Sequence, residues 1–250
     1  MTEQNDTRTT EFSIVAIIPA FNEEASIGKV LDDLSEDLIA ECIVVNNAST
    51  DRTASVADHH GATVLLEQEK GYGAACLKGI SYVLEHYDTK RGTIILFLDG
   101  DHSDFGEQAF RIVEPIIMGD ADMVIGSRTL GNAERGSLTI QQRFGNWLAV
   151  TLIRWLFGFR YTDLGPFRAI RVDALRSLNM RDRNYGWTVE MQIKAVTQGM
   201  KILEVPVDYR VRIGESKVSG TINGTIMAGY KILKTIFQYG WTDRTKGLKK

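Results

Sequence analysis

The chain has 250 residues, of which 44% are hydrophobic and 24% are charged, an ordinary composition for a globular protein with a sizeable core. Its formal net charge of -3 gives no reason to expect nucleic acid as a partner. The two cysteines, Cys42 and Cys76, lie in apolar segments and are expected to be buried thiols in a reducing cytosol, not a disulfide or a metal site.

Neither a targeting signal nor a membrane span is expected. Residues 1–11 are polar and carry acids, which is typical of a flexible N-terminal arm. The longest apolar stretch, 147–159, is shorter than the ~20 residues of a transmembrane helix and contains Arg154. We therefore expect a cytoplasmic protein.

Short apolar runs alternate with helical patterns through the first half of the chain. Strands are expected at 13–18, 42–45, 63–66, 93–98 and 123–125, and helices at 24–38, 53–60, 74–86 and 107–118. Pro19 is expected to end the first strand and Asn22 to cap the first helix. This alternation with short connections predicts an α/β fold, a doubly wound and mostly parallel sheet flanked by helices.

The second half has a different composition. Residues 128–145 are polar and rich in glycine, which predicts a long loop. Beyond them we expect helices at 144–157, 187–198 and 221–239, a tight loop at 162–171, a strand at 201–207 and a basic tail. We interpret this half as an extension packed on the sheet.

Two aspartates, Asp99 and Asp101, directly follow the apolar strand 93–98. Carboxylates at i and i+2 on a turning segment can direct their oxygens at one hard cation, Mg²⁺ or Mn²⁺, which in turn can bridge a diphosphate. Ligands of open α/β sheets gather at this end of the strands. An isolated Asp-x-Asp is also a common chance occurrence, so this position favours a metal site but the rest of the chain has to decide.

Three further loops have a functional interpretation, and the first two also have a structural one. In residues 19–24, Glu23 could accept ribose hydroxyls, or the acids could simply favour a helix start. In residues 46–53, adjacent amides could bind a base edge, or cap the next helix. In residues 69–74, Lys70 could offset phosphate charge beside glycines that allow close backbone approach.

In combination these motifs resemble, in order and spacing, the nucleotide-sugar half of family 2 glycosyltransferases with the GT-A fold. The matching motifs are Pro-Ala-Phe-Asn-Glu-Glu at 19–24, Asn-Asn-Ala-Ser-Thr-Asp at 46–51, Lys-Gly-Tyr-Gly-Ala-Ala at 70–75, Leu-Asp-Gly-Asp at 98–101 and the segment 122–128. The second half resembles the dolichyl-phosphate mannosyl- and glucosyltransferase branch through the segments 162–168, 185–190, 205–207 and 212–217. The resemblance covers residues 13–235.

The resemblance implies one GT-A domain over 12–240, with a nucleotide-sugar half at 12–128, an acceptor half with a helical extension at 129–240 and a basic tail at 241–250. It implies metal contact by Asp99 and Asp101, and catalytic roles for Asp101, Arg128, Arg143 and Glu190. The implied nucleotide-sugar contacts are Pro19, Ala20, Phe21, Glu23, Asn47, Lys70, Gly71, Asp99, Gly100 and Asp101. The implied acceptor or phosphate contacts are Arg143, Arg168, Arg212, Ser216 and Lys217.

Glu190 has three alternative roles. In transferases that act on alcohols, a carboxylate near this helix serves as general base. A phosphate acceptor is already ionised, so Glu190 could instead orient the sugar or an arginine, or be an exposed or capping acid. Two departures from the family pattern also bear on substrates. Asn46-Asn47 replaces the frequent Asp-Asp, and Leu164-Gly165-Pro166-Phe167 replaces Ser-Gly-Phe or Ser-Gly-Tyr.

The implied activity is inverting, metal-dependent transfer of a hexose from UDP-glucose or GDP-mannose to a polyprenyl phosphate. The alternatives are a soluble transferase for a small hydroxyl acceptor with Glu190 as base, and a catalytically silent nucleotide-sugar-binding protein. Aromatic residues of 147–159 and an apolar stripe in the last helix, both flanked by cations, suit peripheral contact with the cytosolic face of a membrane. A core stripe or a homo-oligomer contact would explain the same pattern.

Overall fold

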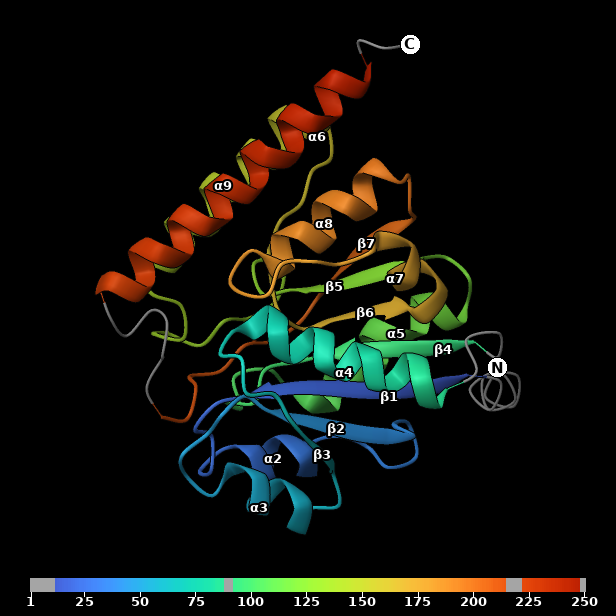
Figure 1. Ribbon diagram of the computed structural model, residues 1–250, viewed down its shortest axis with the longest axis vertical. Coiled ribbons are helices and arrows are strands. Elements are labelled where there is room, and N and C mark those ends of the chain that lie inside the picture. The colour runs from blue at the N-terminus through green and yellow to red at the C-terminus, as the bar shows by residue number, and fades with distance from the viewer. Residues whose placement is uncertain (1–11, 88–91, 215–221, 248–250) are drawn as a thin grey trace.

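The computed structural model describes residues 12–87, 92–214 and 222–247. Within these residues the centre of the molecule is a seven-stranded sheet in the order β3-β2-β1-β4-β6-β5-β7 (Figure 1). The strands are β1 Ser13–Ala20, β2 Glu41–Asn46, β3 Thr63–Leu66, β4 Thr93–Phe97, β5 Met123–Ser127, β6 Arg168–Arg171 and β7 Ile202–Pro206. Strand β6 is antiparallel to β4 and β5, and the other neighbours pair in parallel. The predicted fold class is confirmed.

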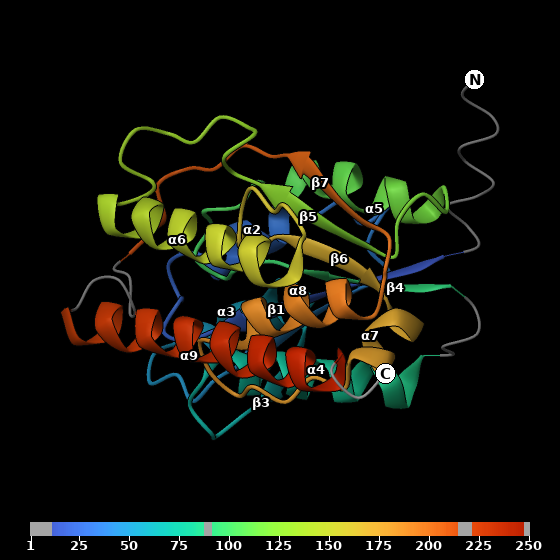
Figure 2. The ribbon, with the colours of Figure 1, turned by 90° about the horizontal axis from the view of Figure 1, so that it is seen from above.

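Helices cover both faces of the sheet. They are α2 Ile27–Asp32, α3 Thr53–His59, α4 Tyr72–His86, the 3-10 turn η1 Gly106–Gln108, α5 Ala109–Ile117, α6 Ile140–Phe157, α7 Val172–Leu178, α8 Trp187–Thr197 and α9 Ile222–Gly247. One apolar core lies under α2, α3 and α5, and the other under α4, α6, α7, α8 and α9. Figure 2 shows α6 and α9 side by side, on the same side of the sheet as α8.

The alternation of β1 explains why this strand is central. Val15 and Ile17 enter one core, while Ile14, Ala16 and Ile18 enter the other. A strand that is apolar on both faces is stable only between two layers of helices.

Strand β1 continues through Pro19 to Ala20, so the expectation that Pro19 ends it was wrong. Pro19 pairs in register with Val45 of β2. On the other side, β4 pairs with β1 only as far as Phe97, which lies opposite Ile17. Pro19 has no N–H to donate, and this costs no hydrogen bond because β4 does not extend to the position beside Pro19.

The first helix is shorter than expected, because α2 covers only Ile27–Asp32. Asn22 is not its cap; Asn22 has a positive φ of 55° and accepts a hydrogen bond from Thr50 N at 2.8 Å. It therefore joins the loops after β1 and β2, which are adjacent at one edge of the sheet.

The second half contributes more to the sheet than expected. The predicted loop at 162–171 contains β6, which lies between β4 and β5, and α7 follows it. Helix α6 begins at Ile140, because Thr139 and Gln142 form a capping box inside the predicted loop at 128–145. Helix α9 extends to Gly247, beyond the expected end at Tyr239 and into the segment expected to be a basic tail.

Candidate active site

One cavity of about 1130 Å³ lies at the carboxyl ends of β1, β2 and β4 and extends to α6 and α9. All ten residues predicted to contact the nucleotide sugar line it, together with Arg128, Arg143 and Arg212. The chain reverses at the end of each strand, so loops that are distant in sequence meet here. The structure thus brings the two predicted halves of the site into one space.

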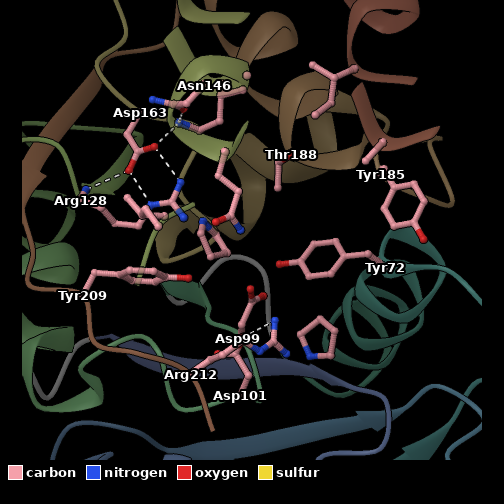
Figure 3. Close-up of a pocket in the computed structure, with 18 of the residues that line it drawn as sticks. Tyr72, Asp99, Asp101, Arg128, Asn146, Asp163, Tyr185, Thr188, Tyr209 and Arg212 are labelled. Atoms are coloured by element: carbon pink, nitrogen blue, oxygen red, sulfur yellow. Dashed lines mark hydrogen bonds and ion pairs between the residues drawn. The ribbon is translucent and has the colours of Figure 1, made fainter. Parts of the chain in front are cut away.

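The two predicted metal ligands lie at the base of this cavity (Figure 3). Asp99 follows β4, and its buried Oδ1 accepts no hydrogen bond from any described residue. Burial, reinforced by the negative charge of Asp101, raises the pKa of Asp99 to about 7. Asp101 is 5% exposed, and Ser103 donates two hydrogen bonds to its Oδ1.

These two carboxylates suit a divalent cation. A buried carboxylate oxygen that has no hydrogen-bond donor and lies beside a second carboxylate is costly unless a cation binds it. The described residues contain no cluster of three or more histidine, cysteine, aspartate or glutamate side chains arranged around a metal position. Mg²⁺ is commonly bound by one or two carboxylates together with substrate phosphates, which matches this donor set.

Arg212 forms ion pairs with two of the donor-side acids, Asp101 and Glu23. Its NH1 lies 3.1 Å from Asp101 Oδ2 and its NH2 lies 3.2 Å from Glu23 Oε1. The segment that carries Arg212 is fixed along the aspartate loop, because Ile213 N donates to Asp101 O at 2.9 Å. Arg212 is therefore held at the aspartate loop, directly beside the predicted metal ligand Asp101.

The side chain of Asn47 holds the loop between β3 and α4 in place. Its amide donates to Glu67 O and Glu69 O at 3.2 and 2.7 Å and accepts from Gly71 N at 2.8 Å. These hydrogen bonds serve the Lys70–Gly71 turn, so the structural interpretation of this amide holds, and its contact with a base stays a prediction. Lys70 in turn lies 5.1 Å from the centre of the Phe21 ring.

The acceptor side is built around Arg128, which follows β5. Its Nε and NH2 donate to Asp163 Oδ2 and Oδ1 at 2.7 and 2.8 Å, as Figure 3 shows. Its guanidinium also lies 5.0 Å from the Tyr209 ring centre. Burial opposes the charge of Arg128, but the facing carboxylate of Asp163 outweighs it and raises the pKa of Arg128 further. Arg143 lines the same side of the cavity from α6.

Two predicted site residues lie elsewhere. Arg168 is fully buried and donates to the carbonyls of Leu164, Gly165 and Thr188, so the expectation that it contacts acceptor phosphate is not met. Glu190 is 1% exposed and does not line the cavity. The Ser216 and Lys217 predictions lie outside the described residues.

Sequence reasoning missed several cavity residues. They are Tyr72, Asn146, Asp163, Asn184, Tyr185, Thr188 and Tyr209. Asp163 lies within the motif at 162–168, and that position is the sequence signal that could have identified it. Nothing local marks Asn146 or Tyr209, because their place in the site depends on long-range packing.

The fold and the cavity define a glycosyltransferase of the GT-A class. The chain belongs to glycosyl transferase family 2, whose sequence profile matches residues 15–178.

Two relatives match the chain over nearly its whole length. An undecaprenyl-phosphate mannosyltransferase of Micrococcus luteus is 30% identical over 252 residues, covering 94% of this chain and 97% of the relative. A dolichyl-phosphate hexose transferase of Haloferax volcanii is 28% identical over 235 residues, covering 93% and 97%. The resemblance to the polyprenyl-phosphate branch of the family is thus confirmed.

A solved structure is similar in fold. Glucosyl-3-phosphoglycerate synthase of Mycobacterium tuberculosis, in complex with Mn²⁺, UDP-glucose and phosphoglyceric acid, superposes with a TM-score of 0.75 at 20% identity. The match covers 96% of this chain and 84% of that one. No helix among the described residues has the length and apolarity needed to cross a membrane.

Proposed function

We propose that the chain moves a hexose, with inversion, from UDP-glucose or GDP-mannose to a polyprenyl phosphate. The observation that carries this proposal is the chemistry of the acceptor side of the cavity. Among the described residues there, Asp163 is the one carboxylate, and Arg128 binds both of its oxygens. A hydroxyl acceptor needs a free base, whereas a phosphate is already ionised.

The donor side supports a nucleoside diphosphate with a divalent metal. Asp99 and Asp101 would hold Mg²⁺ or Mn²⁺, and Arg212, which lies beside Asp101, would face the diphosphate. When bound, the cation would stabilise negative charge on the leaving diphosphate. The similar synthase binds Mn²⁺ with UDP-glucose, and the Micrococcus relative is named a mannosyltransferase, so both donors remain in the proposal.

The transfer requires positioning more than proton chemistry. A phosphate oxygen of the acceptor forms a bond to the anomeric carbon while the bond from that carbon to the diphosphate oxygen breaks. The electron pair leaves with the nucleoside diphosphate, and no proton has to be removed from the acceptor. Arg143 would orient the acceptor phosphate. Arg128 would hold a positively charged guanidinium in a fixed position beside the sugar.

The two outer helices support delivery of the acceptor at a membrane surface. Trp147 and Trp155 of α6 are 58% and 70% exposed, and Trp241 of α9 is 78% exposed. Exposed cations, Arg154 and Lys234, lie on the same two helices. Aromatic and cationic side chains on paired amphipathic helices are typical of interfacial docking. The proposal therefore includes peripheral contact with anionic lipid.

The decisive experiment compares acceptors. Purified protein would be incubated with Mn²⁺ or Mg²⁺, each nucleotide sugar, and either a short polyprenyl phosphate or the corresponding polyprenol. We expect a lipid-linked sugar from the phosphate alone. Transfer to the hydroxyl alone would favour the soluble-transferase alternative, and donor binding without any transfer would favour a silent binding protein.

Membrane contact has its own test. The protein should sediment with anionic vesicles more than with neutral ones, and Trp155→Ala should reduce that binding. If the wild-type protein instead dimerised and did not bind vesicles, and Trp155→Ala abolished the dimer, the aromatic surface would be a homo-oligomer contact.

A further inference from the structure

Glu190 sits in the first turn of α8 and joins two parts of the molecule. Its carboxylate accepts hydrogen bonds from Arg181 N at 3.1 Å and Asp182 N at 2.7 Å. From the other side, Tyr239 of α9 donates its hydroxyl at 2.8 Å, and Lys194 forms an ion pair at 2.7 Å. Burial by itself raises the pKa of Glu190, but these donors outweigh it and hold the pKa below its usual value.

The residues that Glu190 holds belong to a segment that we call the bridge loop, residues 181–186. On the donor side this loop packs against the start of α4. Ala74 N donates to Arg183 O at 2.8 Å, and Arg183 Nε donates to Glu69 Oε1 at 2.6 Å. A methyl group at Gly71 or Gly73 would collide with carbonyl oxygens of the bridge loop. The Lys70–Gly71 turn therefore rests directly on this loop.

The opposite side of the bridge loop contacts α9. Lys231 Nζ lies 3.0 Å from Asp182 Oδ2. At Gly186 the backbone passes so close to α9 that an added methyl would lie 2.6 Å from Thr235 Oγ1. Together with the Tyr239 hydrogen bond, these contacts fix α9 against the loop along three residues of the helix.

Both ends of this chain of contacts line the active-site cavity. On the donor side, Lys70 and Gly71 reach it; on the acceptor side, Gly229 and Ile232 of α9 do. Tyr185, within the bridge loop, lines it as well. Glu190 itself lies outside the cavity, so it has no access to a substrate proton.

We infer that Glu190 is a positioning residue that couples the seating of α9 to nucleotide-sugar binding at the Lys70–Gly71 turn. The inference rests on the proposed function for the identity of the donor. Because coupling between two sites is reciprocal, donor binding should stabilise α9 as much as a seated α9 strengthens donor binding. Docking of α9 on a membrane would then strengthen nucleotide-sugar binding at the surface where the lipid acceptor is present.

The test uses the full chain, UDP-glucose and GDP-mannose, with Mn²⁺ and without acceptor. Calorimetry gives the donor Kd, and amide hydrogen exchange reports the stability of α9. Tyr239→Phe removes one hydrogen bond and keeps the ring, and Glu190→Gln keeps the shape of the side chain. The matched control is Tyr82→Phe, which removes a comparable 3.0 Å hydrogen bond from tyrosine to Glu41 far from α9.

In wild type and Tyr82→Phe, we expect the donor to slow amide exchange in α9. In Tyr239→Phe and Glu190→Gln, that protection should be lost and the donor Kd should rise roughly fivefold or more. An unchanged donor Kd in both variants would overturn the inference. If, in a separate assay with polyprenyl phosphate present, Glu190→Gln then also lowered kcat and lost the acidic limb of the pH profile, Glu190 would be a base. Donor binding that leaves α9 exchange unchanged in wild type would overturn the coupling alone. Failure of wild type to bind either donor would overturn the proposed function and this inference together.

Discussion

Arg212 NH1 lies 3.1 Å from Asp101 Oδ2, so a cation from the segment after the last strand directly faces one of the two carboxylates predicted to bind metal. Arg212 NH2 also lies 3.2 Å from Glu23 Oε1, so this arginine joins the loop after β1 to the aspartate loop after β4. Substitutions at Asp101 and at Arg212 separate the role of the carboxylate from that of the guanidinium.

Asp101→Asn should abolish metal-dependent turnover without unfolding the protein. The amide keeps the oxygen that Ser103 can donate to, but it loses the charge that a hard cation requires. Turnover would be followed with Mn²⁺ and Mg²⁺, and folding by circular dichroism. Asp173→Asn, at an exposed aspartate outside the cavity, is the control and should retain activity. Wild-type turnover in Asp101→Asn would contradict the metal assignment.

Arg212→Ala should weaken donor binding with little effect on the fold. Hydrogen bonds to charged groups contribute about 1.5–3 kcal/mol, which corresponds to a rise in donor KM of roughly ten- to a hundredfold. Arg212→Lys keeps the charge but cannot span Asp101 and Glu23 together, so it should be intermediate. Equal donor KM values in Arg212→Ala and wild type would remove Arg212 from the donor site.

The donor side of the site could be predicted from the sequence because its residues lie in loops that directly follow strongly apolar strands. The parallel sheet itself sets the positions of these residues, which are Asp99 and Asp101 after β4 and Phe21 and Glu23 after β1. Local pattern and topology agree there, so spacing along the chain maps onto neighbours in space.

The acceptor side was less predictable because its geometry depends on contacts between distant segments. Strand β6 has only four residues and begins and ends with arginine, so no local sequence pattern predicts it. It forms because it pairs with β4 and β5. Arg168 looks like a phosphate ligand in the sequence, yet its burial in β6 turns it toward carbonyls of its own loop. Helical periodicity likewise places Glu190 on α8 but cannot tell whether it faces substrate or the bridge loop.

Asp163→Asn should reduce both stability and turnover. The substitution leaves Arg128 buried without its anionic partner, and breaking a buried pair in this way costs about 3–5 kcal/mol. Urea unfolding would give the loss of stability, and kinetics at saturating donor would give the acceptor KM, which should rise because Arg128 is no longer fixed. The double variant Asp163→Asn with Arg128→Met, which removes the unpaired charge, should regain stability without regaining turnover. An additive effect on stability would contradict direct pairing.

The contribution of Glu190 to stability should depend on pH with a definite sign. Burial opposes ionisation, but the donors from Lys194, Asp182 N and Tyr239 prevail and lower the pKa of Glu190 in the folded protein below its ordinary 4.5. Above pH 4.5 the carboxylate is ionised in both the folded and the unfolded chain, so its stabilisation is fully present. As the pH falls through the folded pKa, the carboxylate takes up a proton and the stabilisation is lost. Glu190→Gln should therefore reduce the free energy of unfolding at pH 7 by about 1–3 kcal/mol, and by progressively less below pH 4.5.

Urea unfolding of wild type and variant at pH 7 and at pH 4 or below measures this difference directly. Glu36→Gln, which alters an exposed carboxylate, is the control and should change the free energy of unfolding by less than about 0.5 kcal/mol at either pH. A stability difference for Glu190→Gln that grows as the pH falls would mean that the carboxylate is not held ionised by the bridge loop and α9.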